Sequence, residues 1–234
     1  MAKNATKGNE LSKGVYEVYL GHVKSFILVA DDGSLILVDA GMSEGDGKKI
    51  IGYINSIGKS VKDVKYILLT HSHLDHIGGV AYIQQLSGAK VGIHEDGIRF
   101  VNGEAGLRMP VGHDVRGLLM MNFMKVASGL FKLKPFKPEF LLKEGVFPAD
   151  FHLNAKIIET PGHTSDSISI SLADSKTLIV GDLLRGDKNS LIAPAFYEDY
   201  LGLLNSVKKV KELSPDLICV SHGKNHPVSA IKVM

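Results

Sequence analysis

The sequence predicts a single domain of the mixed α and β class (α+β or α/β), in which two β-sheets pack together and helices lie outside them. Several strand-like segments precede the first long helical segment, and further helices are distributed among the later strands. The 234 residues are enough for one substantial core, and the apolar fraction of 44% and charged fraction of 22% are typical of globular proteins. No low-complexity linker divides the chain, so residues 1–234 are expected to form one domain.

The first strands are expected between residues 15 and 39, in the segments "VYEVYL", "SFILVA" and "SLILVDA", and the "DDG" at 31–33 indicates a hairpin between the last two. The later elements are predicted from short apolar runs and from apolar residues at helical spacing. Strands are expected over residues 64–70, 90–94, 155–160, 167–172, 177–181 and 216–221, and helices over 44–58, 77–87 and 199–213. The first dozen residues are expected to be a loose polar tail.

Residues 95–150 are predicted to be a helical insertion rich in Met and Phe. Between residues 108 and 143 there are seven Lys or Arg and two Asp or Glu, so the local charge is +5. One interpretation is an amphipathic helix that packs on the core with its lysines in water. The alternatives are a lid over a pocket, a dimer contact, or a surface for acyl chains or lipid headgroups. Replacing Met120, Met121 and Met124 would distinguish a lid from plain packing.

Composition excludes several classes of function. The net charge of +2 is too small to indicate nucleic acid binding. The single cysteine, Cys219, allows no disulfide within the chain, which favours a reducing, cytoplasmic setting. The N-terminus lacks the apolar region of a secretory signal, and no run approaches the roughly 18 apolar residues of a membrane span. We therefore expect a cytoplasmic protein that acts on a small-molecule substrate, without nucleic acid and without an integral membrane segment; a homodimer is left open.

The stretch "THSHLDHIGG", residues 70–79, concentrates side chains that bind metals. His71, His73, Asp75 and His76 follow an apolar strand and precede a helix, so they lie on a strand-to-helix loop. In open α/β sheets, ligands bind at loops of this kind, beyond the carboxyl ends of the strands. A solvated loop is the usual environment of one histidine, but it explains three poorly. The spacing therefore predicts a metal site.

Three more candidate ligands follow other predicted strands. His163 lies in "IIETPGHTSDS", Asp182 in "TLIVGDLLRG" and His222 in "DLICVSHGKNHP". Each has a glycine beside it, which lets the backbone approach a bound group closely. Any one of these would be weak by itself, and it is their joint placement after separate strand ends that indicates one shared site.

These residues resemble the five motifs of the metallo-β-lactamase superfamily, in order, from about residue 15 to about residue 225. The motifs are "LILVDAG" with Asp39, "THSHLDHIGG", "PGHT" with His163, "GD" with Asp182 and "SHG" with His222. The resemblance implies a four-layer αββα sandwich of two mixed β-sheets flanked by helices. It also implies that His71, His73 and His163 hold one metal and that Asp75, His76 and His222 hold a second. Asp182 would bridge the two ions, and Asp39 would steady the histidine loop without binding metal.

Five histidines and two carboxylates form a nitrogen and oxygen site that suits two divalent ions, Zn²⁺ first, with Fe or Mn as alternatives. Two such ions lower the pKa of a shared water and supply hydroxide as a nucleophile. Asp75 and Asp182 are the expected catalytic carboxylates, Asp75 by orienting the hydroxide and carrying its proton. The prediction is a metal-dependent hydrolase acting on a small ester, thioester or lactone.

Departures from the family's branches narrow this interpretation. One major subclass of β-lactamases has Cys where this chain has Asp182, and the glutathione thioesterases carry a C-terminal helical domain, whereas 12 residues follow His222 here. Quorum-signal lactonases have Tyr where this chain has Arg185. Arg185 is either a surface cation or a contact for an anionic substrate group. The alternative functions are a phosphodiesterase, a persulfide dioxygenase-like oxidoreductase with one iron, and a metal-stabilised binding protein without turnover.

Overall fold

The computed structural model describes residues 7–113, 117–119, 121–122, 133–174 and 176–233. Within them the first sheet has seven strands in the order β1-β2-β3-β4-β5-β6-β7. The strands from β1 to β4 are antiparallel neighbours, and those from β4 to β7 are parallel, so the sheet is mixed. Its strands are β1 (Gly8–Ser12), β2 (Val15–Tyr19), β3 (Lys24–Val29), β4 (Leu35–Val38), β5 (Val64–Leu68), β6 (Lys90–Ile93) and β7 (Phe140–Leu141).

The second sheet has five strands in the order β14-β11-β10-β9-β8, of which only the pair β11 and β14 is parallel. Its strands are β8 (Gly145–Val146), β9 (Ala155–Glu159), β10 (Ile168–Leu172), β11 (Thr177–Ile179) and β14 (Leu217–Cys219). A small hairpin of β12 (Arg185–Gly186) and β13 (Leu191–Ile192) lies outside both sheets. Both residues of β12 line a cavity at one edge of the sandwich.

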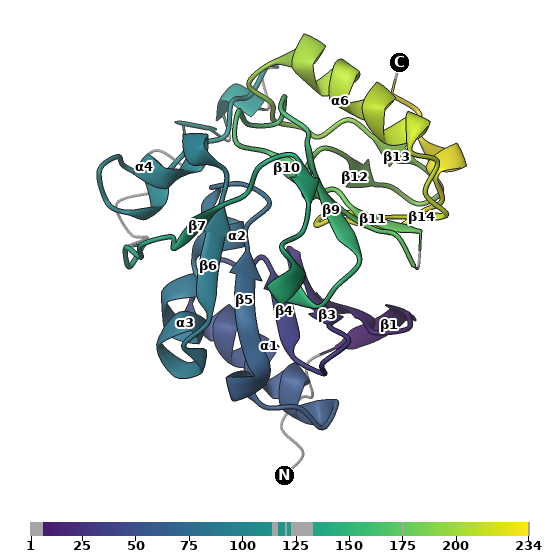
Figure 1. The fold of residues 1–234 in the computed structure, drawn as a ribbon. Helices are drawn as coiled ribbons and strands as arrows, with labels where there is room; N and C mark the ends of the chain where they lie inside the picture. Colours follow the sequence, from purple (N-terminus) through teal and green to yellow (C-terminus); the bar gives the residue numbers. More distant parts are fainter. Residues whose placement is uncertain (1–6, 114–116, 120, 123–132, 175, 234) are drawn as a thin grey trace.

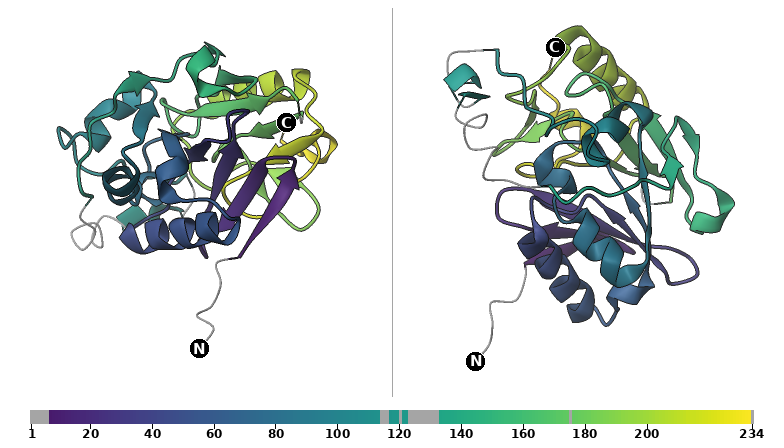
Figure 2. Two further views of the ribbon diagram at one scale, coloured as in Figure 1. Left: turned by 60° about the horizontal axis from the view of Figure 1, so that its bottom comes forward. Right: turned by 90° about the vertical axis from the view of Figure 1, so that its left-hand side faces the viewer.

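Helices cover the outer face of each sheet (Figure 1). The helices α1 (Glu44–Ser56) and α3 (Val80–Ser87) pack against the first sheet, and α6 (Tyr200–Glu212) packs against the second. Two views in Figure 2 show these helices on opposite sides of the molecule. Side-chain caps start the two long helices: the Ser43 hydroxyl accepts a hydrogen bond from the Asp46 amide in α1, and the Asp199 carboxylate accepts one from the Leu201 amide in α6. The layers therefore run helix, sheet, sheet, helix.

Successive side chains of a strand point to opposite faces of its sheet, and this explains why the two sheets stack. In β4, Leu35 and Leu37 point into the core beneath α1 and α3, while Ile36 and Val38 point into the core between the sheets. In β14, Ile218 faces α6 and Cys219 faces the inter-sheet core. Strands that are apolar on both faces are buried on both faces, and the four-layer sandwich follows.

The structure corrects several expected elements. Residues 8–12, expected within a loose tail, form the edge strand β1. The helix expected over 77–87 is two helices, α2 (Leu74–Ile77) and α3, which meet at Gly78 and Gly79. A side chain at Gly78 would lie 1.9 Å from the Met42 carbonyl oxygen, so the glycine pair lets this junction pack on the chain after β4.

The described residues of the segment 95–150 include α4 (Ile98–Val101), short helical pieces at 117–119 and 121–122, and the strands β7 and β8, which extend both sheets. Residues 114–116, 120 and 123–132 lie outside the described residues, so the helical insertion stays a prediction. Met120 and Met124 lie outside the described residues, and Met121 is half-buried. None of the helices in the described ranges is long and apolar enough to cross a membrane.

Candidate metal centre

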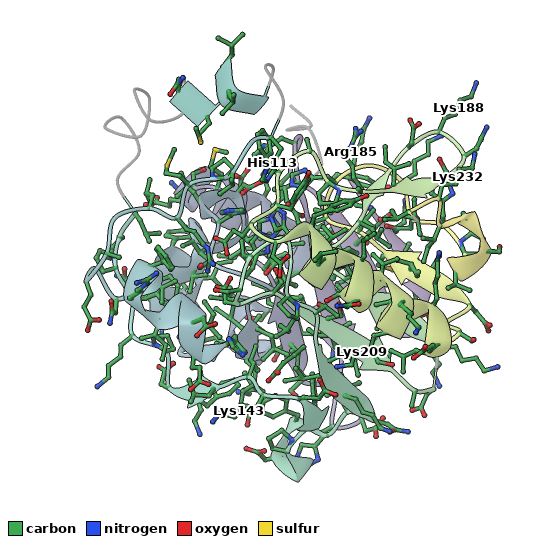
Figure 3. The ribbon with its side chains drawn as sticks, turned by 90° about the horizontal axis from the view of Figure 1, so that it is seen from above. His113, Lys143, Arg185, Lys188, Lys209 and Lys232 are labelled. Atoms are coloured by element: carbon green, nitrogen blue, oxygen red, sulfur yellow. The ribbon has the colours of Figure 1, made fainter. Side chains whose placement is uncertain are left out.

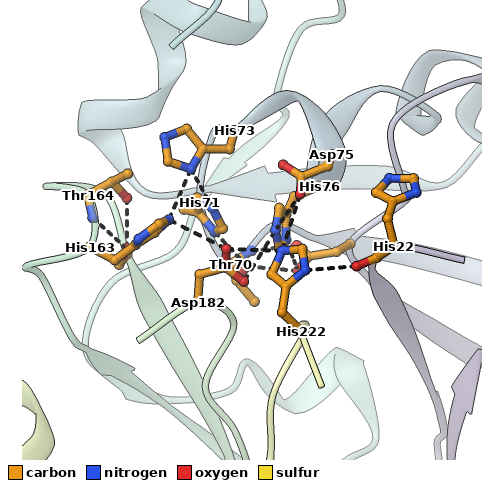
Figure 4. Close-up of polar contacts among 12 residues, drawn as sticks. His22, Thr70, His71, His73, Asp75, His76, His163, Thr164, Asp182 and His222 are labelled. Atoms are coloured by element: carbon orange, nitrogen blue, oxygen red, sulfur yellow. Dashed lines mark hydrogen bonds and ion pairs between the residues drawn. The ribbon is translucent and has the colours of Figure 1, made fainter. Parts of the chain in front are cut away.

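The loops after several neighbouring strands meet at one edge of the sandwich (Figure 4). His71 and His73 follow β5, and Asp75 and His76 lie in α2, which begins directly after them. His163 lies between β9 and β10, Asp182 follows β11, and His222 follows β14. Gly181 (φ +54°) lets the Asp182 loop approach closely, since a side chain there would lie 2.8 Å from the Thr70 hydroxyl. The seven predicted ligands thus converge from separate parts of the sequence.

His71, His73 and His163 form the first group. The Nδ1 atom of His73 lies 3.1 Å from Nε2 of His71 and 3.0 Å from Nε2 of His163. Nitrogens bound to one tetrahedral Zn²⁺ at about 2.0–2.1 Å are roughly 3.3–3.4 Å apart. The three nitrogens therefore have a spacing close to that of ligands around a single ion.

Asp75, His76 and His222 form the second group, and Asp182 lies between the two groups. The Asp75 carboxylate is 3.2 Å from Nε2 of His222 and 3.8 Å from Nε2 of His76. Asp182 lies 3.6 Å from Nε2 of His163, 3.3 Å from that of His222 and 3.5 Å from that of His76. Both groups, and a third combination of His71, His76 and Asp182, have donor atoms close enough to hold a metal ion.

Three buried atoms of this cluster have no hydrogen-bond partner among the described residues: Nε2 of His73, Nε2 of His76 and Oδ1 of Asp182. The last two test whether a metal fits, because they face each other at 3.5 Å. Buried polar atoms in folded proteins are nearly always satisfied, so these two need an additional partner. A cation between the carboxylate and the imidazoles would satisfy both, and the nitrogen and oxygen donors suit a divalent metal.

Burial and neighbouring charges shift the pKa values of the two groups in different directions. Burial and the neighbouring histidines hold the pKa of His71 and of His73 well below the usual value, so both rings are neutral and offer a lone pair. Burial alone would lower the pKa of His222, but the Asp182 and Asp75 carboxylates raise it to about 10. Against the effect of burial, His222 and His76 hold the pKa of Asp182 well below its usual value.

Surrounding groups fix the orientation of the rings. Asp39 is fully buried, and its carboxylate accepts hydrogen bonds at 2.8 Å from the Thr70 amide, the Thr70 hydroxyl and Nδ1 of His76. Nδ1 of His163 donates to the Phe196 carbonyl at 2.7 Å, and Nδ1 of His222 donates to the His22 carbonyl at 2.8 Å. In all three histidines Nε2 is therefore the atom left for the cluster, as is usual for ligands oriented by an outer partner.

A cavity of about 610 Å³ opens onto the cluster. His73, Asp75, His163, Asp182 and His222 form its floor, and apolar side chains form most of its wall. The inserted segment contributes Leu107, Arg108, Met109 and Pro110, and the β12–β13 hairpin contributes Arg185 and Gly186. Cavities of this size bind small molecules.

Comparison with known proteins agrees with this geometry. A model of the Metallo-beta-lactamase superfamily matches residues 19–222. The chain belongs to this superfamily. The probable metallo-hydrolase YflN of Bacillus subtilis (strain 168) is 28% identical over 242 residues, which cover 92% of this chain and 86% of the relative. The uncharacterized protein YobT of the same organism is 30% identical over 208 residues, covering 84% and 82%.

Solved structures of the metallo-beta-lactamase superfamily share the fold. The family protein TTHA1429 from Thermus thermophilus superposes with a TM-score of 0.70 at 20% identity, covering 94% of this chain and 78% of that one. A metallo-beta-lactamase from Pontibacter korlensis superposes with a TM-score of 0.69 at 17% identity, covering 96% and 94%. The predicted family and the predicted αββα sandwich are thereby confirmed.

Beside the superfamily's ligand loops lies a buried charge network that sequence patterns did not reveal. The Arg108 guanidinium donates two hydrogen bonds to the Glu198 carboxylate, at 2.6 and 2.8 Å, and one to Asp166, at 2.8 Å. It also donates to the hydroxyls of Ser72 and Ser165. Ser72 lies between His71 and His73, and Asp166 lies three residues after His163. Arg108 therefore ties the inserted segment to both loops of the first group.

Proposed function

We propose that this protein is a dinuclear metal-dependent hydrolase that acts on a small ester, thioester or lactone. The observation that carries the proposal is the convergence of two ligand groups around Asp182 on the floor of an apolar cavity. Two divalent ions, when bound there, lower the pKa of a shared water and polarise the substrate carbonyl. We expect Zn²⁺, with Fe or Mn as alternatives.

The side chains of this chain have distinct roles in the proposed reaction. His71, His73 and His163 would hold one ion, Asp75, His76 and His222 the other, and Asp182 would set their separation. Asp75 borders the cavity, and its side chain is 24% exposed, so it is placed to accept the proton of the attacking water and pass it to the leaving group. The apolar wall excludes bulk water and accommodates an acyl chain.

Two further observations support an acyl substrate. YflN is named a probable metallo-hydrolase, and another relative, 26% identical over 155 residues, is a hydroxyacylglutathione hydrolase. That second match covers 66% of this chain and 43% of the relative, so it supports the bond type and not the glutathione group. No residue of the described cavity wall is a Ser or Cys nucleophile, which fits attack by water.

The second ligand group is consistent with a hydrolase and with the one-iron oxidoreductase, and metal stoichiometry separates the two, since two ions favour hydrolysis and one iron favours oxygen chemistry. The purified protein should be assayed for metals and then tested against panels of esters, thioesters, lactones and phosphodiesters. Turnover of a carboxylic ester, thioester or lactone by protein containing two ions supports the proposal. A single iron with oxygen consumption on persulfides, or turnover of phosphodiesters alone, would contradict it.

A further inference from the structure

Two arginines line the cavity, and their surroundings differ. Arg108 is buried, and the carboxylates of Asp166 and Glu198 neutralise its charge. Arg185 is exposed and makes no ion pair with any residue that the structure describes. The other charged groups of the cavity are Asp75, Asp182 and the histidines of the metal cluster. Arg185 is therefore the unneutralised positive charge in the described part of the cavity wall.

The backbone of Arg185 is fixed next to the metal cluster. Leu183 and Leu184, which separate it from Asp182, are buried in the core beneath α6. The Gly186 amide donates to the His222 carbonyl at 2.9 Å, and a side chain at Gly186 would lie 1.9 Å from the Lys224 carbonyl oxygen. This close approach of two backbones locks the β12–β13 hairpin onto the His222 loop. A guanidinium on such a support loses little further backbone freedom when it binds a ligand.

Apolar side chains line much of the cavity that the cluster and the hairpin share. Met109, Pro110, Pro194, Ala195, Phe196 and Leu184 contribute to the cavity wall. Such a wall favours a hydrocarbon chain, and a guanidinium beside it favours an oxyanion, a carboxylate or a phosphate, held by two hydrogen bonds. Figure 3 shows Arg185 and Lys188 of the same hairpin reaching outward from the molecule, with Lys188 farther from the centre.

We infer that Arg185 selects substrates whose apolar acyl chain ends in an oxyanion, a carboxylate or a phosphate, at the end opposite the bond that is cleaved. This inference rests on the proposed hydrolase function, because the cleaved bond must lie at the metal cluster. The site would thus take amphipathic substrates with an anionic tail and discriminate against neutral chains of the same length.

Binding tests the inference without turnover. Suberate and octanoate have the same number of carbon atoms, and one carboxylate of either can bind the metals, but only suberate has a second carboxylate at the other end. Calorimetry on the metal-loaded protein should show suberate binding about tenfold more tightly than octanoate. Arg185→Gln should abolish that preference, and Arg185→Lys should retain part of it. Lys188→Gln removes one positive charge from the same hairpin outside the cavity and should keep the full preference.

Turnover supplies an independent test. The substrates are 4-nitrophenyl half-esters of dicarboxylic acids from adipate to sebacate, their ω-carboxamides, and ω-phosphonate counterparts that distinguish carboxylate from phosphate recognition. The ratio of kcat/KM for the charged and neutral partners should fall about tenfold in Arg185→Gln and remain unchanged in Lys188→Gln. If no ester is hydrolysed, the proposed function fails, and the suberate measurement still decides the role of Arg185. Equal binding ratios in Arg185→Gln and the unaltered protein would overturn the inference.

Discussion

The two ligand groups of the candidate metal centre, which form its first and second halves, differ in burial and in charge. His71, His73 and His163 are nearly inaccessible to solvent, and the structure keeps His71 and His73 neutral. In the second half His76 is fully buried, but the side chains of Asp75 and His222 are 24% and 29% exposed, and the two carboxylates raise the pKa of His222 to about 10. The first half is anchored by the Arg108 network, whereas His222 is oriented by a loop carbonyl of His22.

The difference indicates that the two ions would have different tasks. A buried set of three neutral nitrogens binds a cation without first losing protons, so the first half is suited to permanent retention. The exposed half, with a carboxylate and a proton to release, is suited to exchange with water and substrate. The following predictions test this division, from the largest expected effect to the smallest.

Asp182→Ala should damage both halves at once, because this carboxylate lies between them. We expect the loss of both ions and a decrease in kcat of more than about a thousandfold, since the chemistry depends on activating water. His222→Ala should mainly empty the second half, so its effect should be smaller, as should that of any other single histidine change. Metal analysis and turnover assays measure both variants. Full metal content with near-normal activity in Asp182→Ala would remove its bridging role.

Arg108→Met should weaken metal binding by the first half, because it destabilises the folded loops that carry His71, His73 and His163. The substitution leaves the buried Asp166 carboxylate without its charged partner, which typically costs about 3–5 kcal/mol of unfolding free energy. Urea unfolding measures the loss, and Arg108→Met combined with Asp166→Asn should recover part of it. Strictly additive effects of the two substitutions would show that the pair is not coupled. We also expect metal to be lost from the first half before the second in Arg108→Met.

Zinc binding to the two halves should respond differently to pH. The carboxylates raise the pKa of His222 to about 10 and hold that of His76 well above its usual value, and zinc needs both rings neutral, so binding displaces up to two protons. Where both rings are protonated, affinity for the second equivalent should therefore rise by up to about a hundredfold for each pH unit. The pKa of His71 and His73 lies well below neutrality, so the first equivalent should be almost insensitive above about pH 7. Calorimetric titration in buffers of different ionisation enthalpy measures the released protons. An equal pH dependence of the zinc affinity for both equivalents would contradict the proposed difference between the two halves.

Met109→Ser should give the smallest effect. Met109 belongs to the inserted segment and lines the cavity, so it tests whether this segment shapes substrate choice. Losing one apolar contact of roughly 1 kcal/mol should lower kcat/KM about fivefold for longer acyl chains, with fold and metal content unchanged. Met121→Ser is the matched control, because Met121 is absent from the described cavity wall. An identical chain-length profile in both variants would favour plain packing over a lid.

The ligand loops could be predicted from the sequence because each follows a buried strand and combines His or Asp with glycine. Each loop is recognisable from its own few residues, although the loops come together only in the folded protein. Asp39 could be predicted from the same motifs, and the structure places it against Thr70 and His76.

The Arg108 network could not be predicted in the same way. Arg108 contacts Asp166 and Glu198, which lie 58 and 90 residues further along the chain. Asp166 lies in the His163 motif, but neither Arg108 nor Glu198 has a distinctive neighbourhood in the sequence. The edge strand β1 was missed because "GNELS" carries no apolar alternation, and its register is set by pairing with β2. The β12–β13 hairpin has two residues per strand, too few for any periodicity.

The metal content of the saturated protein tests the central claim most directly. We predict two ions per chain, separated by about 3.5–4 Å in anomalous diffraction, with the ion at Asp75, His76 and His222 removed first by a chelator. One ion per chain at saturating metal, with these three side chains free of metal, would contradict the dinuclear site and the hydrolase built on it.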